Sequence, residues 1–136
     1  MNWKLILLLS LFGLAMGLAT VFFIPSNIEP AFWLVIFVVC AYVIAKQTRK
    51  PFLHGVLLGL ANCVWITSAH ILLFDQYIAT HGQEAAMMSS MSIAPRLVML
   101  LVGPLIGLIS GIVIGVLAVL AARLNSRRTA RRAAAG

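Results

Sequence analysis

Four long stretches of the chain are apolar almost without interruption, and polar residues gather between them. The stretches are residues 5–24, 31–45, 52–74 and 97–122. An α-helix needs about 20 apolar residues to cross the hydrocarbon core of a membrane. The second stretch is the shortest, and the short turn 25–30 pairs it with the first. The pattern predicts an all-α membrane protein with four transmembrane helices in one domain, residues 1–122.

The first stretch also has features of a secretory signal peptide, with a basic start and small residues at Ala15 and Gly17. The hydrophobic region of such a signal is about 7–15 residues long. Here the apolar run continues through Val21 to Ile24. We therefore expect a retained transmembrane helix rather than a cleaved signal.

Charge is scarce in this chain, and its placement is one-sided. Only 10% of the residues are charged, whereas a soluble domain carries charge on about a quarter of its residues, so a water-soluble monomer is excluded. In a four-span layout all lysines and arginines except Arg96 fall on one side, namely Lys4, Lys46, Arg49, Lys50, Arg123, Arg127, Arg128, Arg131 and Arg132. Cytoplasmic loops carry the excess of Lys and Arg. Both termini are therefore predicted to face the cytoplasm, as in a multi-pass protein of a bacterial inner membrane.

The segment 123–136 carries five arginines directly after the fourth stretch. It is predicted to be a basic cytoplasmic tail that extends the last helix along anionic lipid headgroups, where each cationic side chain gains about 1 kcal/mol. Nucleic acid also attracts arginine runs, but the position next to a membrane span favours lipid. The predicted partners are therefore the bilayer and its anionic lipids, and not nucleic acid.

The connection 75–96 is the longest segment outside the predicted spans. Thr80 and Gln83 have the spacing of a capping box, which marks the start of a helix. Residues 84–93 contain neither glycine nor proline, and Pro95 would stop a helix. We expect a short interfacial helix of about ten residues on the outer face, between the third and fourth spans.

Glycine recurs at a spacing of four residues within three of the predicted spans. The glycines in these runs are Gly13, Gly17, Gly55, Gly59, Gly103, Gly107, Gly111 and Gly115. On a helix this spacing forms a flat face that lets a neighbouring backbone approach closely. The runs therefore predict close helix packing of the glycine-zipper type, either within one subunit or between subunits.

Polar side chains inside the predicted spans are the first candidates for function. Asn62 and Cys63 lie near the middle of the third span, and Ser110 lies near the middle of the fourth. An unsatisfied amide in lipid costs several kcal/mol, so Asn62 has to face protein or water. These side chains either join helices, with Ser110 as the partner of Asn62, or line a polar path. His70, near the outer end of the third span, either bonds locally or forms a proton-linked switch with Asp75.

The outer segment offers a different chemistry. His81 is followed by three methionines on one side of the predicted interfacial helix, Met87, Met88 and Met91. Imidazole and thioether groups suit Cu(I), so copper handling on the outer face is the alternative function. Methionines also anchor a helix against lipid or protein as adaptable apolar side chains. We favour this second interpretation because no cysteine or further methionine cluster completes a metal site.

Catalytic and cofactor motifs are missing from the sequence. It has no set of nucleophile, base and acid, no phosphate-binding loop and no zinc-ligand spacing, and Cys40 and Cys63 lie within spans, which argues against a disulfide. We expect a non-enzymatic protein without a cofactor. The leading hypothesis is a packed helical bundle that serves as a small transporter or channel-type subunit, or as an accessory subunit of a membrane complex. Four short helices enclose little volume, so a pore would require a homo-oligomer.

Overall fold

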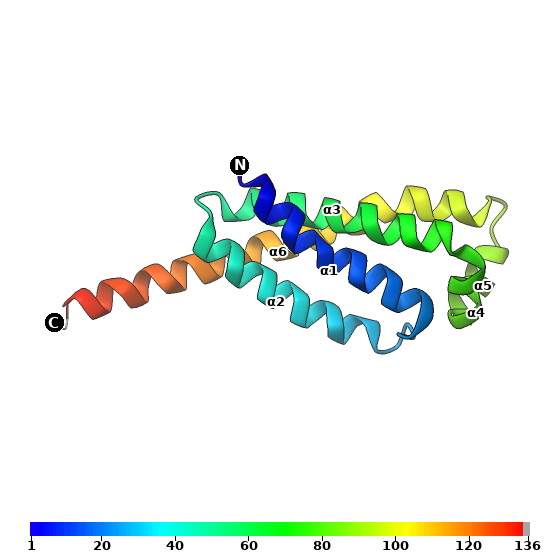
Figure 1. Cartoon of the computed structure of the whole chain (residues 1–136), viewed down its shortest axis with the longest axis horizontal. Coiled ribbons are helices and arrows are strands. Elements are labelled where there is room, and N and C mark those ends of the chain that lie inside the picture. The colour runs from blue at the N-terminus through cyan, green and yellow to red at the C-terminus, as the bar shows by residue number, and fades with distance from the viewer. Residues whose placement is uncertain (135–136) are drawn as a thin grey trace.

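Residues 1–134, which the computed structural model describes, form six helices joined by short loops (Figure 1). In chain order they are α1 (Trp3–Phe22), α2 (Glu29–Gln47), α3 (Pro51–Leu72), α4 (Phe74–Thr80), α5 (Gly82–Ser89) and α6 (Pro95–Ala134). Four of them, α1, α2, α3 and the Pro95–Arg127 part of α6, are long and apolar enough to cross a membrane. The predicted fold class is confirmed: the fold has four long apolar helices and a short helical segment between the third and the fourth.

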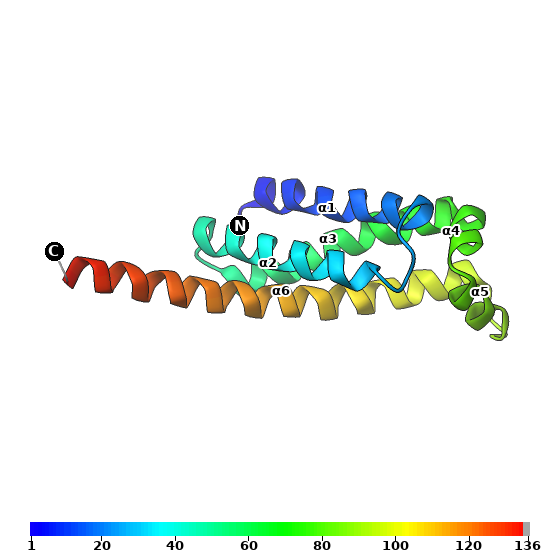
Figure 2. The same ribbon diagram turned by 90° about the horizontal axis from the view of Figure 1, so that it is seen from below.

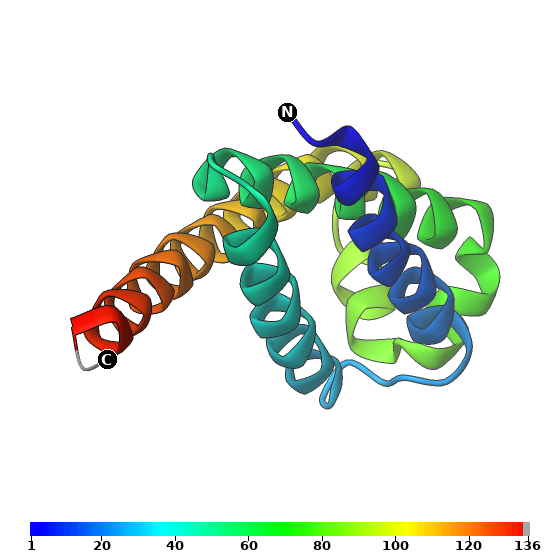
Figure 3. The same ribbon diagram turned by 60° about the vertical axis from the view of Figure 1, so that its left-hand side comes forward.

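The long helices run alternately up and down, so their connections gather at two ends (Figure 1, Figure 2). The N-terminus, the α2–α3 turn and the C-terminal part of α6 lie toward one end. The α1–α2 loop, α4 and α5 lie at the other, which we call the α4–α5 end. α3 packs between α1 and α6, and α2 packs on α6. Although α1 and α2 are consecutive, they make little contact, and Figure 3 shows them lying apart.

Two of the helices are longer than the apolar stretches that predicted them. α2 begins at Glu29, because Pro30 fits the first turn of a helix, where the backbone N–H has no partner to lose. α6 continues to Ala134 without a break, because the segment 123–134 has neither glycine nor proline and is rich in alanine and arginine. The basic segment therefore projects from the bundle as a helix (Figure 1), and positions 135–136 of the predicted tail lie outside the described residues.

The helical segment between α3 and α6 begins differently from the prediction. The prediction of a capping box at Thr80 and Gln83 is wrong. Thr80 is the last residue of α4, and α5 starts without a side-chain cap. The hydroxyl oxygen of Thr80 lies 3.2 Å from the carbonyl oxygen of Val21 and 3.0 Å from that of Tyr77. It therefore ties α4 to the end of α1 instead of capping α5.

The observed helix also ends earlier than the predicted helix 84–93, because α5 stops at Ser89. The Ser89 hydroxyl donates to the Ala86 carbonyl over 2.8 Å, and the Ser90 hydroxyl donates to the Met87 carbonyl over 2.7 Å. Such side-chain bonds compete with the backbone hydrogen bonds of a continuing helix. α5 therefore ends at Ser89. Together with α4 before it, the segment between α3 and α6 consists of two short helices rather than one.

Glycines lie where α3 and α6 approach each other most closely. Gly55 lies against the backbone of Gly115, and Gly59 lies against the backbone of Gly111. A methyl group added at Gly111 would lie 2.6 Å from the carbonyl oxygen of Val56, closer than side-chain carbons come in real structures. At this contact the two antiparallel backbones leave no room for a side chain.

The remaining span glycines also face α3. Gly103 and Gly107 of α6 lie against the side chains of Thr67 and Cys63. On the opposite side of α3, a methyl group at Gly13 of α1 would lie 2.7 Å from Oδ1 of Asn62. α3 is thus held closely by α1 on one side and by α6 on the other.

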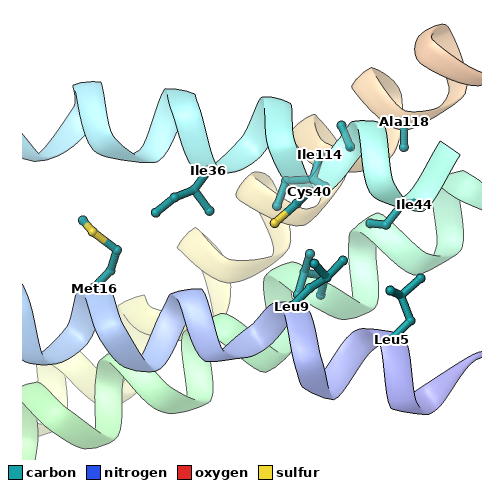
Figure 4. Packing of buried hydrophobic residues seen from close by; sticks show 10 residues of the cluster. Leu5, Leu9, Met16, Ile36, Cys40, Ile44, Ile114 and Ala118 are labelled. Atoms are coloured by element: carbon teal, nitrogen blue, oxygen red, sulfur yellow. The ribbon is translucent and has the colours of Figure 1, made fainter. Parts of the chain in front are cut away.

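The main apolar core lies toward the end that carries the N-terminus. Figure 4 shows Leu9 of α1, Cys40 and Ile44 of α2 and Ile114 of α6 gathered in this cluster. All four side chains are buried. This packing fixes the C-terminal half of α2 against α6, while the N-terminal half of α2 lies outside most of it.

Candidate functional site

A cavity of about 800 Å³ lies between α2, α3 and α6 and reaches the α4–α5 end. The N-terminal half of α2 forms one wall, and residues 59–70 of α3 and 98–110 of α6 form the others. Most of the lining is apolar, including Trp33, Leu34, Phe37, Ile66, Met88, Met99, Val102 and Ile106. Gly59, Gly103 and Gly107 also line the cavity, at the close contact between α3 and α6.

Polar side chains of α3 and α6 also line this cavity. Asn62, Cys63 and Ser110 all line it, so the structure brings the three predicted candidates together. Asn62 is only 4% exposed, and in the part of the chain that the structure describes its Oδ1 atom has no hydrogen-bond partner. Asn62 and Ser110 therefore share a cavity without the predicted hydrogen bond between them. The Cys63 Sγ atom lies 3.8 Å from Oγ1 of Thr67.

Three aromatic rings stack at the α4–α5 end. His70 and Tyr77 stack with 4.2 Å between their ring centroids, and Tyr77 and His81 stack at the same separation. Nε2 of His70 lies 2.8 Å from Oγ1 of Thr20, which holds the ring against α1. His70 and Tyr77 also line the cavity. The stack joins α3, α4 and the start of α5 around the cavity end.

The alternative in which His70 pairs with Asp75 is contradicted by the structure. Oδ1 of Asp75 lies 3.7 Å from a guanidinium nitrogen of Arg96, and both side chains are exposed. α4 presents Tyr77 to the bundle, which leaves Asp75, two residues earlier, on the solvent side. The proton-linked switch proposed for this pair therefore has no structural basis.

Two carboxylates stand at the α4–α5 end of the cavity. Glu29 of α2 and Glu84 of α5 both line it, and Nε1 of Trp33 donates to Oε1 of Glu29 over 2.9 Å. Burial, followed by the charges of Glu84 and Glu29, raises the pKa of Tyr77 to about 12, so its hydroxyl stays protonated at neutral pH. The cavity thus combines an apolar body with one acidic, hydrogen-bonding end.

The residues proposed for copper lie in two different places. Met87, Met88 and Met91 line the cavity, whereas His81 lines a separate small pocket of about 220 Å³ next to the α1–α2 loop. Among residues 1–134 as described, no group of three His, Cys, Asp or Glu side chains gathers as metal ligands. The structure therefore does not bring His81 and the methionines into one set.

Four cavity residues, Glu29, Trp33, Tyr77 and Glu84, are not singled out by the sequence pattern. They belong to segments far apart in the chain, and each lies near the end of a predicted span, where polar and aromatic residues are common. One signal was present, since the chain has only three acidic residues. Acids close to apolar helices are rare and mark functional sites by default.

The two cysteines are both buried and free, but they have different surroundings. Cys40 lies in the apolar core (Figure 4), and Cys63 lines the cavity. The chain thus carries one thiol inside the cavity and one thiol away from it.

No protein family, curated protein or solved structure matches this chain. Its function therefore has to be inferred from the cavity and from the side chains that line it.

Proposed function

We propose that the protein binds an amphipathic small molecule in the cavity between α2, α3 and α6, within a bacterial inner membrane. The observation that supports this most strongly is an apolar cavity of about 800 Å³ with acidic side chains at one end only. Ligand pockets measure about 300–1,000 Å³ and combine apolar walls with a few polar groups. A molecule with an apolar body and one polar end is the complement of such a cavity.

The opening of the cavity supports entry of this molecule from the lipid phase. Leu34 of α2 and Ile106 of α6 line the cavity and are 64% and 57% exposed, so the space between these helices reaches the apolar surface of the bundle. An apolar body gains nothing from passing through water first. With both termini in the cytoplasm, as the charge distribution predicts, the acidic end lies in the outer leaflet.

A binding role suits a non-enzymatic transport subunit or an accessory subunit of a larger membrane complex. Toward the end that carries the N-terminus, the bundle is filled by the core of Leu9, Ile44 and Ile114. A filled core at this end argues against an open channel through the bundle. It favours a protein that binds a ligand or delivers it to a partner subunit. At that same end the arginine-rich part of α6 would contact anionic headgroups.

An affinity label tests this proposal. N-dodecylmaleimide joins an apolar chain to a thiol-reactive head, and Cys63 lies in the cavity while Cys40 lies in the core. In phosphatidylcholine nanodiscs we expect Cys63 to be alkylated at least about tenfold faster than Cys40, which corresponds to about 1.4 kcal/mol of preferential access. The two rates are measured by mass spectrometry of the intact protein and its peptides.

Two neighbouring tryptophan substitutions provide the control. Ile106→Trp fills the cavity, whereas Leu105→Trp places the same side chain on the outer surface, where Leu105 is 58% exposed and does not line the cavity. Ile106→Trp should slow the alkylation of Cys63 to the rate of Cys40, and Leu105→Trp should leave it unchanged. Equal rates at the two cysteines of the wild type, or equal effects of the two tryptophans, would contradict the proposal.

A further inference from the structure

The residues that line the cavity also give its length. On α6 the lining runs from Val98 to Ser110, and on α3 it runs from Gly59 to His70. A helix rises by 1.5 Å per residue, so these two walls are about 18 Å and about 17 Å long. Gly59 lies against Gly111, the neighbour of Ser110, so both walls end at the same depth.

Side chains of the main core close the cavity at its inner end. Phe37, Asn62 and Ser110 line the inner part of the cavity, one from each wall. One helical turn further from the α4–α5 end, each of these helices presents a buried residue on nearly the same face. These floor residues are Ala41 of α2, Leu58 of α3 and Ile114 of α6, which are 3%, 0% and 0% exposed. All three belong to one core cluster, in which Figure 4 labels Ile114.

The opening of the cavity toward lipid lies above this floor. Leu34 stands at the opening, whereas Ile36, half a turn further along α2, is 9% exposed and belongs to the core cluster. Phe37 packs against the same cluster. An apolar chain that reaches the floor therefore cannot continue straight. A longer chain has to bend back toward the opening, which restricts its torsion angles.

The distance from the floor to the α4–α5 end corresponds to a definite chain length. Because a C–C single bond measures about 1.5 Å, an extended alkyl chain advances by about 1.3 Å per carbon. We propose that the cavity selects its ligand by chain length, and that the ligand is an amphiphile with a chain of about 12 carbons, about 15 Å when extended; this inference rests on the proposed function. The remaining length holds the polar end of the ligand beside Glu29 and Tyr77.

Selection by length separates such a ligand from long-chain lipids. An extended chain of 16–18 carbons is about 20–23 Å long, which exceeds both walls of the cavity. Lipids with these chains therefore do not fill the cavity in a straight conformation. The floor keeps the cavity available to the shorter amphiphile in a bilayer where the longer lipids are in large excess.

Competition between alcohols of different lengths tests this limit. Decan-1-ol, dodecan-1-ol, tetradecan-1-ol and hexadecan-1-ol share one head group, and each is brought to the same mole fraction in nanodiscs of phosphatidylcholine with 16- and 18-carbon chains. Protection is the slowing of the alkylation of Cys63 by N-dodecylmaleimide. We expect the strongest protection from dodecan-1-ol, at about a tenfold lower mole fraction than hexadecan-1-ol needs for the same effect.

Two substitutions at the inner end should move the preferred length in opposite directions. Ser110→Leu raises the floor and should shift the strongest protection to decan-1-ol. Ile114→Ala lowers the floor and should shift it to tetradecan-1-ol. Ile112→Ala makes the same change at a position that is 42% exposed and does not line the cavity, so it should leave the preference at dodecan-1-ol. Circular dichroism shows whether each variant is folded, and Ser110→Leu decides the test if Ile114→Ala does not fold.

The outcomes separate this inference from the proposed function. If protection is independent of chain length or keeps rising to hexadecan-1-ol, or if Ser110→Leu keeps the preference of the wild type, selection by length is overturned while the binding cavity stands. If no alcohol protects Cys63, both fall together. Dilauroylphosphatidylcholine, which carries two 12-carbon chains, distinguishes the source of the chain: its protection of Cys63 supports a short-chain lipid, and protection by dodecan-1-ol alone supports a single-chain molecule.

Discussion

Gly111→Leu is expected to unfold the bundle or prevent its assembly, whereas Val113→Leu should leave it nearly unchanged. A side chain at position 111 would meet the backbone of α3 at once, since even a methyl group would lie 2.6 Å from the carbonyl oxygen of Val56. A backbone atom cannot rotate aside, so α3 and α6 would have to separate. Overpacking of a core commonly costs about 1–3 kcal/mol, and against a backbone we expect a loss of stability of about 3 kcal/mol or more.

Thermal unfolding in one detergent, followed by circular dichroism, measures this difference. Val113 is exposed on α6, so its substitution by leucine should change the free energy of unfolding by less than about 0.5 kcal/mol. Equal melting temperatures for Gly111→Leu and Val113→Leu would show that the α3–α6 contact does not depend on glycine.

Ser92→Cys is expected to react with a membrane-impermeant thiol reagent in intact bacterial cells, and Ser126→Cys only after the cells are opened. Ser92 lies exposed in the loop between α5 and α6, and Ser126 lies exposed on the arginine-rich part of α6. The excess of lysine and arginine at the end that carries both termini predicts that this end faces the cytoplasm. Cys40 and Cys63 are buried, which keeps the background labelling low.

Labelling of both engineered cysteines from the same side would contradict the predicted arrangement of four spans. Labelling of Ser126→Cys alone in intact cells would reverse it. The reversed orientation would move the acidic end of the cavity to the cytoplasmic leaflet, and the ligand would then be drawn from the opposite side.

The four apolar helices could be predicted because the requirement for about 20 apolar residues leaves a direct trace in the sequence. Their neighbours could not, because a helix that faces lipid and a helix that faces protein are both apolar. For this reason the short loop after α1 suggested that α1 and α2 pair, whereas α2 packs on α6. The packing role of the eight span glycines stays a prediction, which the Gly111→Leu experiment tests.

The candidate site could be predicted only in part. Asn62, Cys63 and Ser110 were selected as polar residues at membrane depth, and all three line the cavity. Glu29 and Glu84 could not be connected, because no spacing rule links residues from α2 and α5. The alternative that paired His70 with Asp75 rested only on their nearness in sequence, and it is contradicted because α4 turns Asp75 outward.

Native mass spectrometry of the protein released from its own membrane tests the binding function most directly. We predict one small amphipathic molecule bound per chain in the wild type and in Leu105→Trp, and none in Ile106→Trp, because only Ile106 lines the cavity. A wild-type protein without a bound small molecule, or the same bound molecule in both tryptophan variants, would contradict a binding function for this cavity.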